Sequence, residues 1–499
     1  MLAQLSAAAV FGVDAVPVSV EVDVSPGLPG VTMVGLPDAT VRESRERVRT
    51  AIRNSGFPFP TTRVTVSLAP ADLKKVGAAF DLPIALGVLA ASGVLPVREK
   101  PPMTIVGGLS LDGGVPPMQG LLPIAVTSRR TAQPALMFPS ANLSEAGIVE
   151  NLRLFPVQSL WDAVRIVASN DPPAAARPAH VFDPNDVPVD DLADVRGQSI
   201  GRRALEIAAA GAHHLLFSGP PGAGKTMLAR RLSGLLPPLS FDEALDVTTI
   251  HSVAGLLRPG SGLVSARPFR APHHTCSDVA LVGGGAIPRP GELSLAHCGV
   301  LFLDELPEFS RRVLESLRQP LEQGVVHIAR ANRTMTFPAR VTLVAAMNPC
   351  PCGFLGDNRR PCRCPPATVD RYRRRLSGPL RDRFDLGVEV QPVEWQEIGA
   401  EDGPESTAVV KTRVSAARSR QLDRQGLLNA GLEGRVLRTI CRISPAASRQ
   451  LGAAIKRLGL SARAITRVLR VGRTIADLEN EAGIADHHLA EALQFRLLS

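Results

Sequence analysis

A glycine-rich segment, GPPGAGKT at residues 219–226, constrains the fold of this 499-residue chain more than any other feature. It follows the apolar run LLFS and precedes the helix-forming stretch MLARRLSGLL, which is the strand, loop and helix context of a P-loop. Backbone N–H groups of such a loop turn inward around phosphates, Lys225 reaches the β- and γ-phosphates, and the Thr226 hydroxyl coordinates Mg²⁺. The segment therefore predicts a site for ATP and Mg²⁺ in a parallel sheet joined by crossover helices. Its phosphate-binding residues are Gly219, Pro220, Pro221, Gly222, Ala223, Gly224, Lys225 and Thr226.

Two later apolar segments end in polar residues that suit nucleotide hydrolysis. Residues 299–303 read GVLFL and precede Asp304, expected near the metal, and Glu305, expected to polarise a water for attack on the γ-phosphorus. Residues 341–347 read VTLVAAM and precede Asn348, whose neutral amide can hold that water or sense the γ-phosphate. Many strands end in acidic loops or turn residues, so it is the preceding P-loop that favours the catalytic interpretation.

The length of the chain predicts roughly two to four domains, since a single hydrophobic core seldom grows to 499 residues. Residues 1–168 alternate strand-like and helical stretches and predict a small α/β domain. Residues 169–191 are rich in Pro, Ala and Asp and predict a linker. Residues 192–391 hold the nucleotide motifs, and residues 392–499 have helical spacing, which predicts an all-helical lid.

The chain is basic, with a formal net charge of +9 and arginine as the main source of positive charge. Because guanidinium groups bind phosphate in a bidentate manner, nucleic acid is a candidate partner, and a solvated basic surface is the alternative. No apolar run reaches the roughly 18 residues of a membrane span, and the start has no basic segment before its apolar stretch. We therefore expect a cytoplasmic protein without a membrane partner.

Four of the seven cysteines form a cluster between residues 350 and 364. Two tight turns, each carrying a pair of cysteines, bracket a loop with glycine and proline, so four thiolates can converge on one tetrahedral Zn²⁺. The candidate ligands are Cys350, Cys352, Cys362 and Cys364. Four protein ligands would leave no open position, which indicates a structural rather than a catalytic metal. Four reduced cysteines in a turn-rich loop are the alternative.

Two arginine-rich segments are candidates for contact with phosphate. The first surrounds the cysteine loop and contains Arg359, Arg360, Arg363, Arg371, Arg373, Arg374, Arg375, Arg381 and Arg383, some of which must serve subunit contacts or a neighbour's ATP. The second lies between the ATP motifs, contains Arg267, Arg270 and Arg289, and is expected to form mobile loops that face a central pore. The adjacent His273 and His274 would point to opposite faces of a strand, which favours hydrogen bonding over metal binding. With aromatic residues at 4%, tracking of the DNA backbone, weakened by salt and blind to sequence, is favoured over base stacking.

The order of GPPGAGKT, VLFLDE, AAMNPC and LRDRFDL resembles that of the AAA+ ATPases of the magnesium-chelatase-like group, and LSARAITRVLRVGRTIADL is similar to the lid of that group. The resemblance implies that Arg383 is an arginine finger and that Arg463 is the second sensor arginine, which ties the lid to the nucleotide. A finger that enters a neighbour's site implies a ring-shaped homo-oligomer.

The segments VGLPDATVRESRERVRTAI and VSLAPADLKKVGAAFDLPIAL resemble the Lon-protease-like (S5-type) domain of the ComM family, also called the YifB family. The resemblance then covers nearly the whole chain. It implies a hexameric DNA helicase that drives branch migration on branched or single-stranded DNA during integration of foreign DNA. Two other functions stay open: a chelatase-like motor that remodels a protein partner, and a scaffold in which ATP acts only as a switch. Chelatase motor subunits lack this N-terminal domain, which makes the first of these the runner-up.

A protease of the Lon type needs a serine nucleophile and a lysine base. Where that pattern places the serine this chain has Ala79, and where it places the lysine this chain has Leu122. We therefore expect a protease-like fold without peptidase activity, with an unrelated nucleophile as the alternative.

Overall fold

The computed structural model describes residues 1–35, 39–71, 77–95, 103–131, 134–169, 190–258, 260–285, 287–330, 333–357, 360–393 and 403–496. Its contacts divide the chain into two compact units. The first comprises Met1–Asp183, Ala244–Val264 and Ala329–Phe337, and the second comprises Pro184–Glu243, Ser265–Ile328 and Pro338–Ser499. Most of the expected linker at 169–191 lies outside the described residues.

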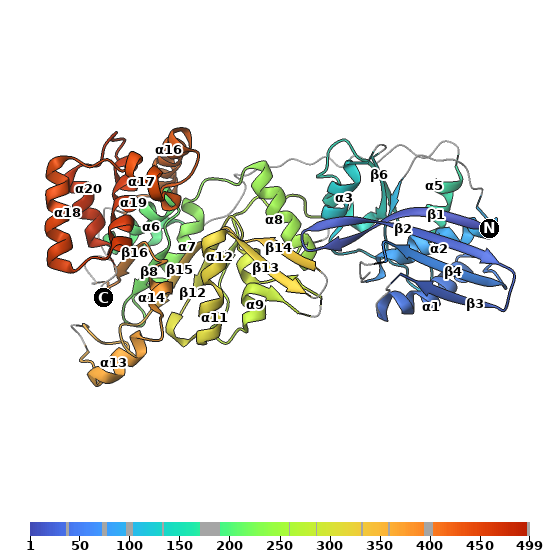
Figure 1. Ribbon diagram of the computed structural model, residues 1–499, viewed down its shortest axis with the longest axis horizontal. Helices are drawn as coiled ribbons and strands as arrows, with labels where there is room; N and C mark the ends of the chain where they lie inside the picture. Colours follow the sequence, from blue (N-terminus) through green and yellow to red (C-terminus); the bar gives the residue numbers. More distant parts are fainter. Residues whose placement is uncertain are drawn as a thin grey trace. The chain divides into compact units, whose positions relative to one another are not determined.

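A seven-stranded mixed sheet forms the first unit, in the order β3-β4-β2-β1-β5-β6-β7. Figure 1 labels its strands β1, β2, β3, β4 and β6. The strands are β1 (Leu2–Phe11), β2 (Asp14–Ser25), β3 (Gly30–Val34), β4 (Arg63–Ala69), β5 (Thr104–Ile105), β6 (Ala135–Pro139) and β7 (Arg153–Val157). The β1–β2 and β2–β4 pairs are antiparallel and the others are parallel. Alternate residues Val18, Val20 and Val22 of β2 are buried, as the two-residue period of a strand requires.

Five helices accompany this sheet in the described part of Met1–Asp183: α1 (Ala39–Asn54), α2 (Asp81–Ala91), α3 (Leu121–Arg129), α4 (Leu143–Ala146) and α5 (Leu160–Ala168). Helix α2 is buried along almost its whole length, and a Cβ added to its Gly87 would lie 2.6 Å from Val22 Cγ2. Buried Glu145 accepts hydrogen bonds from the Leu122 N–H (2.9 Å), from Asn142 Nδ2 (2.9 Å) and from the Ser252 hydroxyl. Ser252 lies in α8 (Phe241–Ala254), most of which belongs to this unit.

A five-stranded parallel sheet forms the centre of the second unit, in the order β16-β8-β15-β12-β9. Its strands are β8 (Leu215–Ser218), β9 (Phe269–Arg270), β12 (Val300–Leu303), β15 (Thr342–Met347) and β16 (Leu386–Glu389). Residues of β12 and β15 are buried on both faces, as is usual for a parallel sheet covered by helices. The short pairs β10 (Gly283–Gly284) with β11 (Arg289–Pro290) and β13 (Val325–Arg330) with β14 (Arg333–Pro338) lie between these strands in the chain. This mixed α/β architecture with a parallel sheet confirms the expected fold class.

The helices around the parallel sheet are α6 (Ser199–Gly211), α7 (Lys225–Leu235), α9 (Asp278–Val282), α10 (Glu292–Leu295), α11 (Arg311–Ser316), α12 (Arg318–Gln323), α13 (Pro366–Arg373) and α14 (Gly378–Arg381). The described C-terminal part is helical and forms the expected lid, with α16 (Thr407–Gln425), α17 (Gly434–Ile440), α18 (Pro445–Leu458), α19 (Ala462–Leu478) and α20 (Asp486–Gln494). Short 3₁₀ turns, η1 (Ala78–Phe80), η2 (Ser140–Asn142), η3 (Leu192–Asp194), η4 (Leu306–Glu308) and η5 (Asn429–Gly431), complete the described elements. Over the described ranges, every helix is too short or too polar to cross a bilayer.

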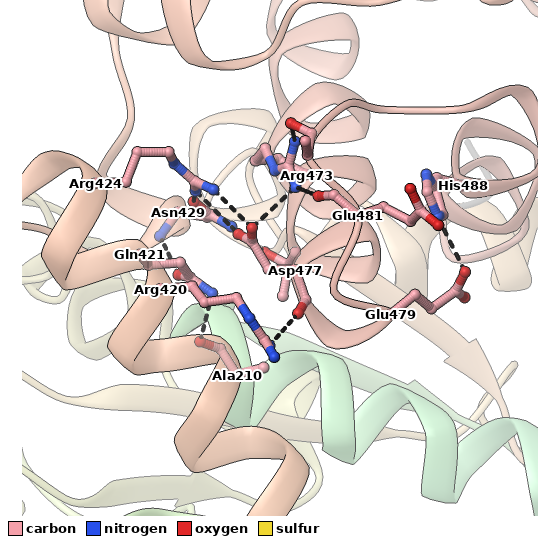
Figure 2. Close-up of polar contacts among 12 residues, drawn as sticks. Ala210, Arg420, Gln421, Arg424, Asn429, Arg473, Asp477, Glu479, Glu481 and His488 are labelled. Carbon is pink, nitrogen blue, oxygen red and sulfur yellow. Dashed lines mark hydrogen bonds and ion pairs between the residues drawn. The ribbon is translucent and has the colours of Figure 1, made fainter.

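A buried carboxylate holds the lid together (Figure 2). Asp477 of α19, only 1% exposed, accepts hydrogen bonds from Arg424 (2.7 and 3.0 Å), Arg473 (2.9 Å) and Asn429 (2.8 Å). A buried charge is tolerated only when it is paired and hydrogen-bonded, so these contacts fix α16, η5 and α19 relative to one another. The same lid shares one apolar core with the sheet, which includes Phe217 and Val471.

Candidate ATP site

The three motif strands are neighbours in the parallel sheet, with β15 between β8 and β12. Met347 pairs with Ser218, and Ala345 pairs with Leu303, so the ends of all three strands reach the same edge. The P-loop, Asn348 and the Asp304-Glu305 pair therefore converge there. This convergence is the first requirement of the predicted ATP site, and it depends on a strand order that no local pattern encodes.

The P-loop has the backbone that its glycines allow. Gly222 and Gly224 have φ angles of 76° and 90°, and a Cβ added to Gly219 would lie 2.2 Å from the carbonyl oxygen of Val390. Lys225 donates from Nζ to the carbonyl oxygens of Gly219 (2.7 Å) and Pro220 (2.9 Å) and to Asn348 Oδ1 (3.2 Å). Burial lowers the pKa of Lys225. The ammonium group is thus held at the loop, where phosphate oxygens can replace these acceptors.

Oxygen ligands suited to Mg²⁺ lie next to one another at this edge. The Thr226 hydroxyl donates to Asp304 Oδ2 (2.9 Å), and Asp304 Oδ1 accepts the N–H of Glu305 (2.9 Å). Hydroxyl and carboxylate oxygens are hard ligands of the kind that Mg²⁺ takes together with nucleotide phosphates. The donor set therefore fits the metal that the sequence predicts.

Glu305 has a strained backbone and a partner that sequence reasoning did not assign. Its φ angle of 50° lies in the left-handed region, which costs a residue with a Cβ about 1 kcal/mol or more and is common at functional sites. Its Oε2 lies 3.1 Å from Nδ1 of His274. His274 belongs to a turn between the two motifs, and nothing in its spacing links it to Glu305.

The histidine pair has the expected hydrogen-bonding role, since His273 Nδ1 also lies 2.9 Å from the Thr275 hydroxyl. The expectation that the two rings point to opposite faces is wrong, because their centroids lie only 4.1 Å apart. The physical reason is that the segment forms a turn and not a strand.

Both proposed arginines of the ATP cycle make ion pairs within this chain. Arg383 pairs with Glu322 (2.8 Å), and Arg463 pairs with Asp382 (2.9 Å). Asp382 also accepts a hydrogen bond from Arg467 of α19 (3.2 Å). Two residues of the lid therefore contact the motif that carries Arg383. The finger role of Arg383 and the sensor role of Arg463 stay predictions. The contact of Arg467 with Asp382 was missed, although Arg467 follows Arg463 by one helical turn.

Several other singled-out residues make internal contacts. Arg267 donates to the carbonyl oxygen of Cys298 (2.6 Å) and pairs with Glu243 (2.9 Å), and Arg270 pairs with Glu292 (2.6 Å). Arg359 lies outside the described residues. The protease positions carry apolar side chains, with Ala79 in η1 and buried Leu122 in α3.

The four clustered cysteines have their sulfur atoms within 4.8 Å of one another. Cys350 Sγ lies 3.3 Å from Cys352 Sγ and 3.6 Å from Cys362 Sγ, and the latter two atoms are 3.6 Å apart. Tetrahedral Zn²⁺ with Zn–S bonds of about 2.3 Å places its sulfurs roughly 3.8 Å apart, so the arrangement fits. The backbone N–H groups of Phe354 and Arg363 lower the pKa of Cys352 to about 6, which favours the thiolate form that binds metal.

Three family models match the chain. Residues 191–398 match magnesium chelatase, subunit ChlI, residues 20–142 match subunit ChlI of Mg-chelatase, and residues 404–496 match the C-terminal part of that subunit. Together with the parallel sheet and its three motifs, these matches define an AAA+ ATPase of the magnesium-chelatase type. Membership of that class implies ATP hydrolysis with Mg²⁺.

Similar proteins extend over the full length. YifB of Salmonella typhimurium is 46% identical over 100% of this chain and 97% of its own length, and competence protein ComM of Haemophilus influenzae is 45% identical over 100% and 98%. The chain therefore belongs to the ComM/YifB family. Lon protease 2 of Bacillus subtilis is 31% identical over 152 residues, which are 28% of this chain and 26% of that protein. This partial similarity to a Lon protease agrees with the expected fold class.

Proposed function

We propose that this protein is an ATP-driven DNA motor, a helicase or branch-migration translocase that works as a homo-hexameric ring in recombination or uptake of foreign DNA. The observation that carries the motor is the convergence of Lys225, Thr226, Asp304, Glu305 and Asn348 at one sheet edge. The full-length similarity to a competence protein and the net charge of +9 support DNA as the partner.

The contacts at the sheet edge suggest how the residues share the work. Lys225 exchanges its loop carbonyls for phosphate oxygens, and Thr226 and Asp304 hold Mg²⁺, which neutralises charge on the phosphates. Glu305 accepts the proton of the attacking water, while His274 restrains its carboxylate. Asn348 orients that water or the γ-phosphate, and Arg383 of a neighbouring copy stabilises the developing charge.

The remaining parts of the chain have supporting roles in this proposal. The four cysteines hold a structural Zn²⁺, and the lid contributes Arg463 to nucleotide sensing. Residues 1–168 form a Lon-protease-like domain without peptidase activity that modifies substrate engagement, 169–191 link it to the ATPase core at 192–391, and 392–499 form the lid. The protein acts in the cytoplasm.

A second candidate function is a chelatase-like motor that remodels a protein partner. The observation in its favour is the match of residues 191–398 to a magnesium chelatase subunit. Such a motor would hydrolyse ATP at a rate that DNA does not change.

The steady-state ATPase rate with and without branched or single-stranded DNA, at two salt concentrations, separates these functions. A DNA motor predicts strong stimulation that falls as salt rises, because contacts with phosphate release counterions. Lys225→Ala serves as the blank. A rate that is indifferent to DNA would favour the protein-remodelling motor.

A further inference from the structure

The segment that carries the cysteine cluster begins inside the ATP site. Cys350 follows Asn348 by two residues at the end of β15, and its side chain is fully buried. Asn348 in turn accepts a hydrogen bond from Lys225 (3.2 Å). The cluster therefore begins two residues along the chain from a side chain that contacts the P-loop lysine.

A second contact joins the cysteine loop to the P-loop itself. Gly353 has a φ angle of 85°, and a Cβ added to it would lie 2.6 Å from Pro221 Cδ and 2.9 Å from Pro221 Cγ. The loop backbone thus lies directly against Pro221, the second proline of GPPGAGKT. Only glycine allows both this backbone conformation and this close approach.

Two further contacts come from the segment just after the cluster, which contains α13. Burial raises the pKa of Tyr372 to about 12 and the backbone of Asn348 opposes this shift, so the hydroxyl of this side chain, only 6% exposed, lies close to Asn348. Arg375 donates to the carbonyl oxygen of Pro307 (3.2 Å) and pairs with Glu308 (2.8 Å), in the turn that follows Glu305. The cysteine loop therefore contacts the P-loop, and the segment after it lies beside Asn348 and contacts the turn that follows Glu305.

The cysteine loop has few buried side chains in the part that the structure describes. Most described residues between 351 and 365 are exposed or half-buried, and none of them is in a helix or strand. A segment without its own apolar core depends on cross-links for order, and a metal held by four thiolates is such a cross-link.

We propose that the metal held by Cys350, Cys352, Cys362 and Cys364 sets the geometry of the ATP site. It does so through the close approach of Gly353 to Pro221 and the position of the Tyr372 hydroxyl beside Asn348. This inference rests on the proposed Zn²⁺ site and adds to it a role in ATP turnover. Tyr372 and Gly353 are positioning residues in this scheme, because they act on Asn348 and the P-loop and touch no reacting atom.

The test measures three quantities on the full-length protein: bound zinc per chain, the affinity for a fluorescent ATP analogue, and kcat with KM for ATP. Cys352→Ser should lose the metal and lower kcat by about tenfold or more, the equivalent of roughly 1.4 kcal/mol in the barrier. Tyr372→Phe should keep the metal and the analogue affinity while kcat falls by about threefold or more, because the backbone of Asn348 loses its polar contact with the Tyr372 hydroxyl. Gly353→Ala should keep the metal and weaken analogue binding, because the added methyl displaces Pro221.

Cys298→Ser, the same substitution outside the cluster, is the matched control and should keep both metal and turnover. Loss of metal in Cys352→Ser with unchanged kcat and affinity would overturn the coupling between the metal and the ATP site. It would not contradict the zinc site itself. A wild-type protein without zinc would overturn both. Neither result would touch the proposed DNA motor, whose test is the stimulation of ATP hydrolysis by DNA. Unchanged kcat and analogue affinity in both Tyr372→Phe and Gly353→Ala would also contradict the coupling, because each substitution removes one of the two contacts that carry it.

Discussion

Glu305 is the residue on which the difference between a motor and a nucleotide switch depends. Its φ of 50° and its contact with His274 are the observations behind the proposed role of its carboxylate as a base. Glu305→Gln should lower kcat by about 100-fold or more while leaving ATP affinity within a few-fold, because only proton transfer is lost. Single-turnover hydrolysis and equilibrium binding measure the two quantities. A variant that loses hydrolysis but keeps the protein's function would indicate a switch.

His274 is the residue-scale finding that the sequence did not predict, and its role can be tested against Glu305. His274→Ala should lower kcat by about fivefold to tenfold, because the carboxylate loses the partner at 3.1 Å. The same change made in Glu305→Gln should have almost no further effect, since the interaction is already gone. Additive losses in this double-mutant cycle would show that His274 acts elsewhere.

His214 gives the fold a predicted dependence on pH. Burial lowers its pKa to about 4, and its Nδ1 accepts the N–H of Leu343 (3.0 Å), which requires an unprotonated ring nitrogen. The unfolded chain takes up this proton near pH 6.5, so the stabilisation is complete above that pH and is lost as pH falls towards 4. The melting temperature of the wild type should fall more steeply over this window than that of His214→Asn, whose amide can accept the same bond. Equal slopes would contradict the assignment.

At the scale of elements, the strands and helices that carry motifs could be predicted because their signals are local. An apolar run followed by a glycine loop or by Asp304 and Glu305 identifies β8 and β12 directly. The placement of β15 between them could not be predicted, since strand order depends on long-range pairing. For the same reason the ion pair of Arg467 with Asp382 was missed: the partners are 85 residues apart in the chain.

The lid depends on Asp477, which joins three of its elements (Figure 2). Asp477→Asn should destabilise the protein by about 3 kcal/mol, because Arg473, only 1% exposed, would keep a buried charge without its counterion. Denaturant unfolding followed by circular dichroism measures this change. Asp423→Asn on exposed α16 surface is the control and should change the unfolding free energy by less than about 0.5 kcal/mol. Equal effects of the two substitutions on the unfolding free energy would contradict the stabilising role of Asp477 in the lid.

At the scale of the whole molecule, contacts group the chain differently from its linear order. Ala244–Val264 and Ala329–Phe337 lie between the ATP motifs in sequence, yet they belong to the same unit as the N-terminal sheet. The sequence suggests contiguous domains because composition and periodicity report only local structure. Contacts such as that of Ser252 with Glu145, 107 residues apart, carry no local signal.

The central claim is that ATP hydrolysis at the edge of the parallel sheet moves DNA strands. The most direct measurement is the rate of branch migration on a mobile four-way junction, followed by fluorescence with ATP and Mg²⁺. We predict ATP-dependent migration by the wild type, none by Lys225→Ala or Glu305→Gln, and a rate that falls as salt rises. Active ATP hydrolysis by the wild type without any movement of the junction would contradict the claim.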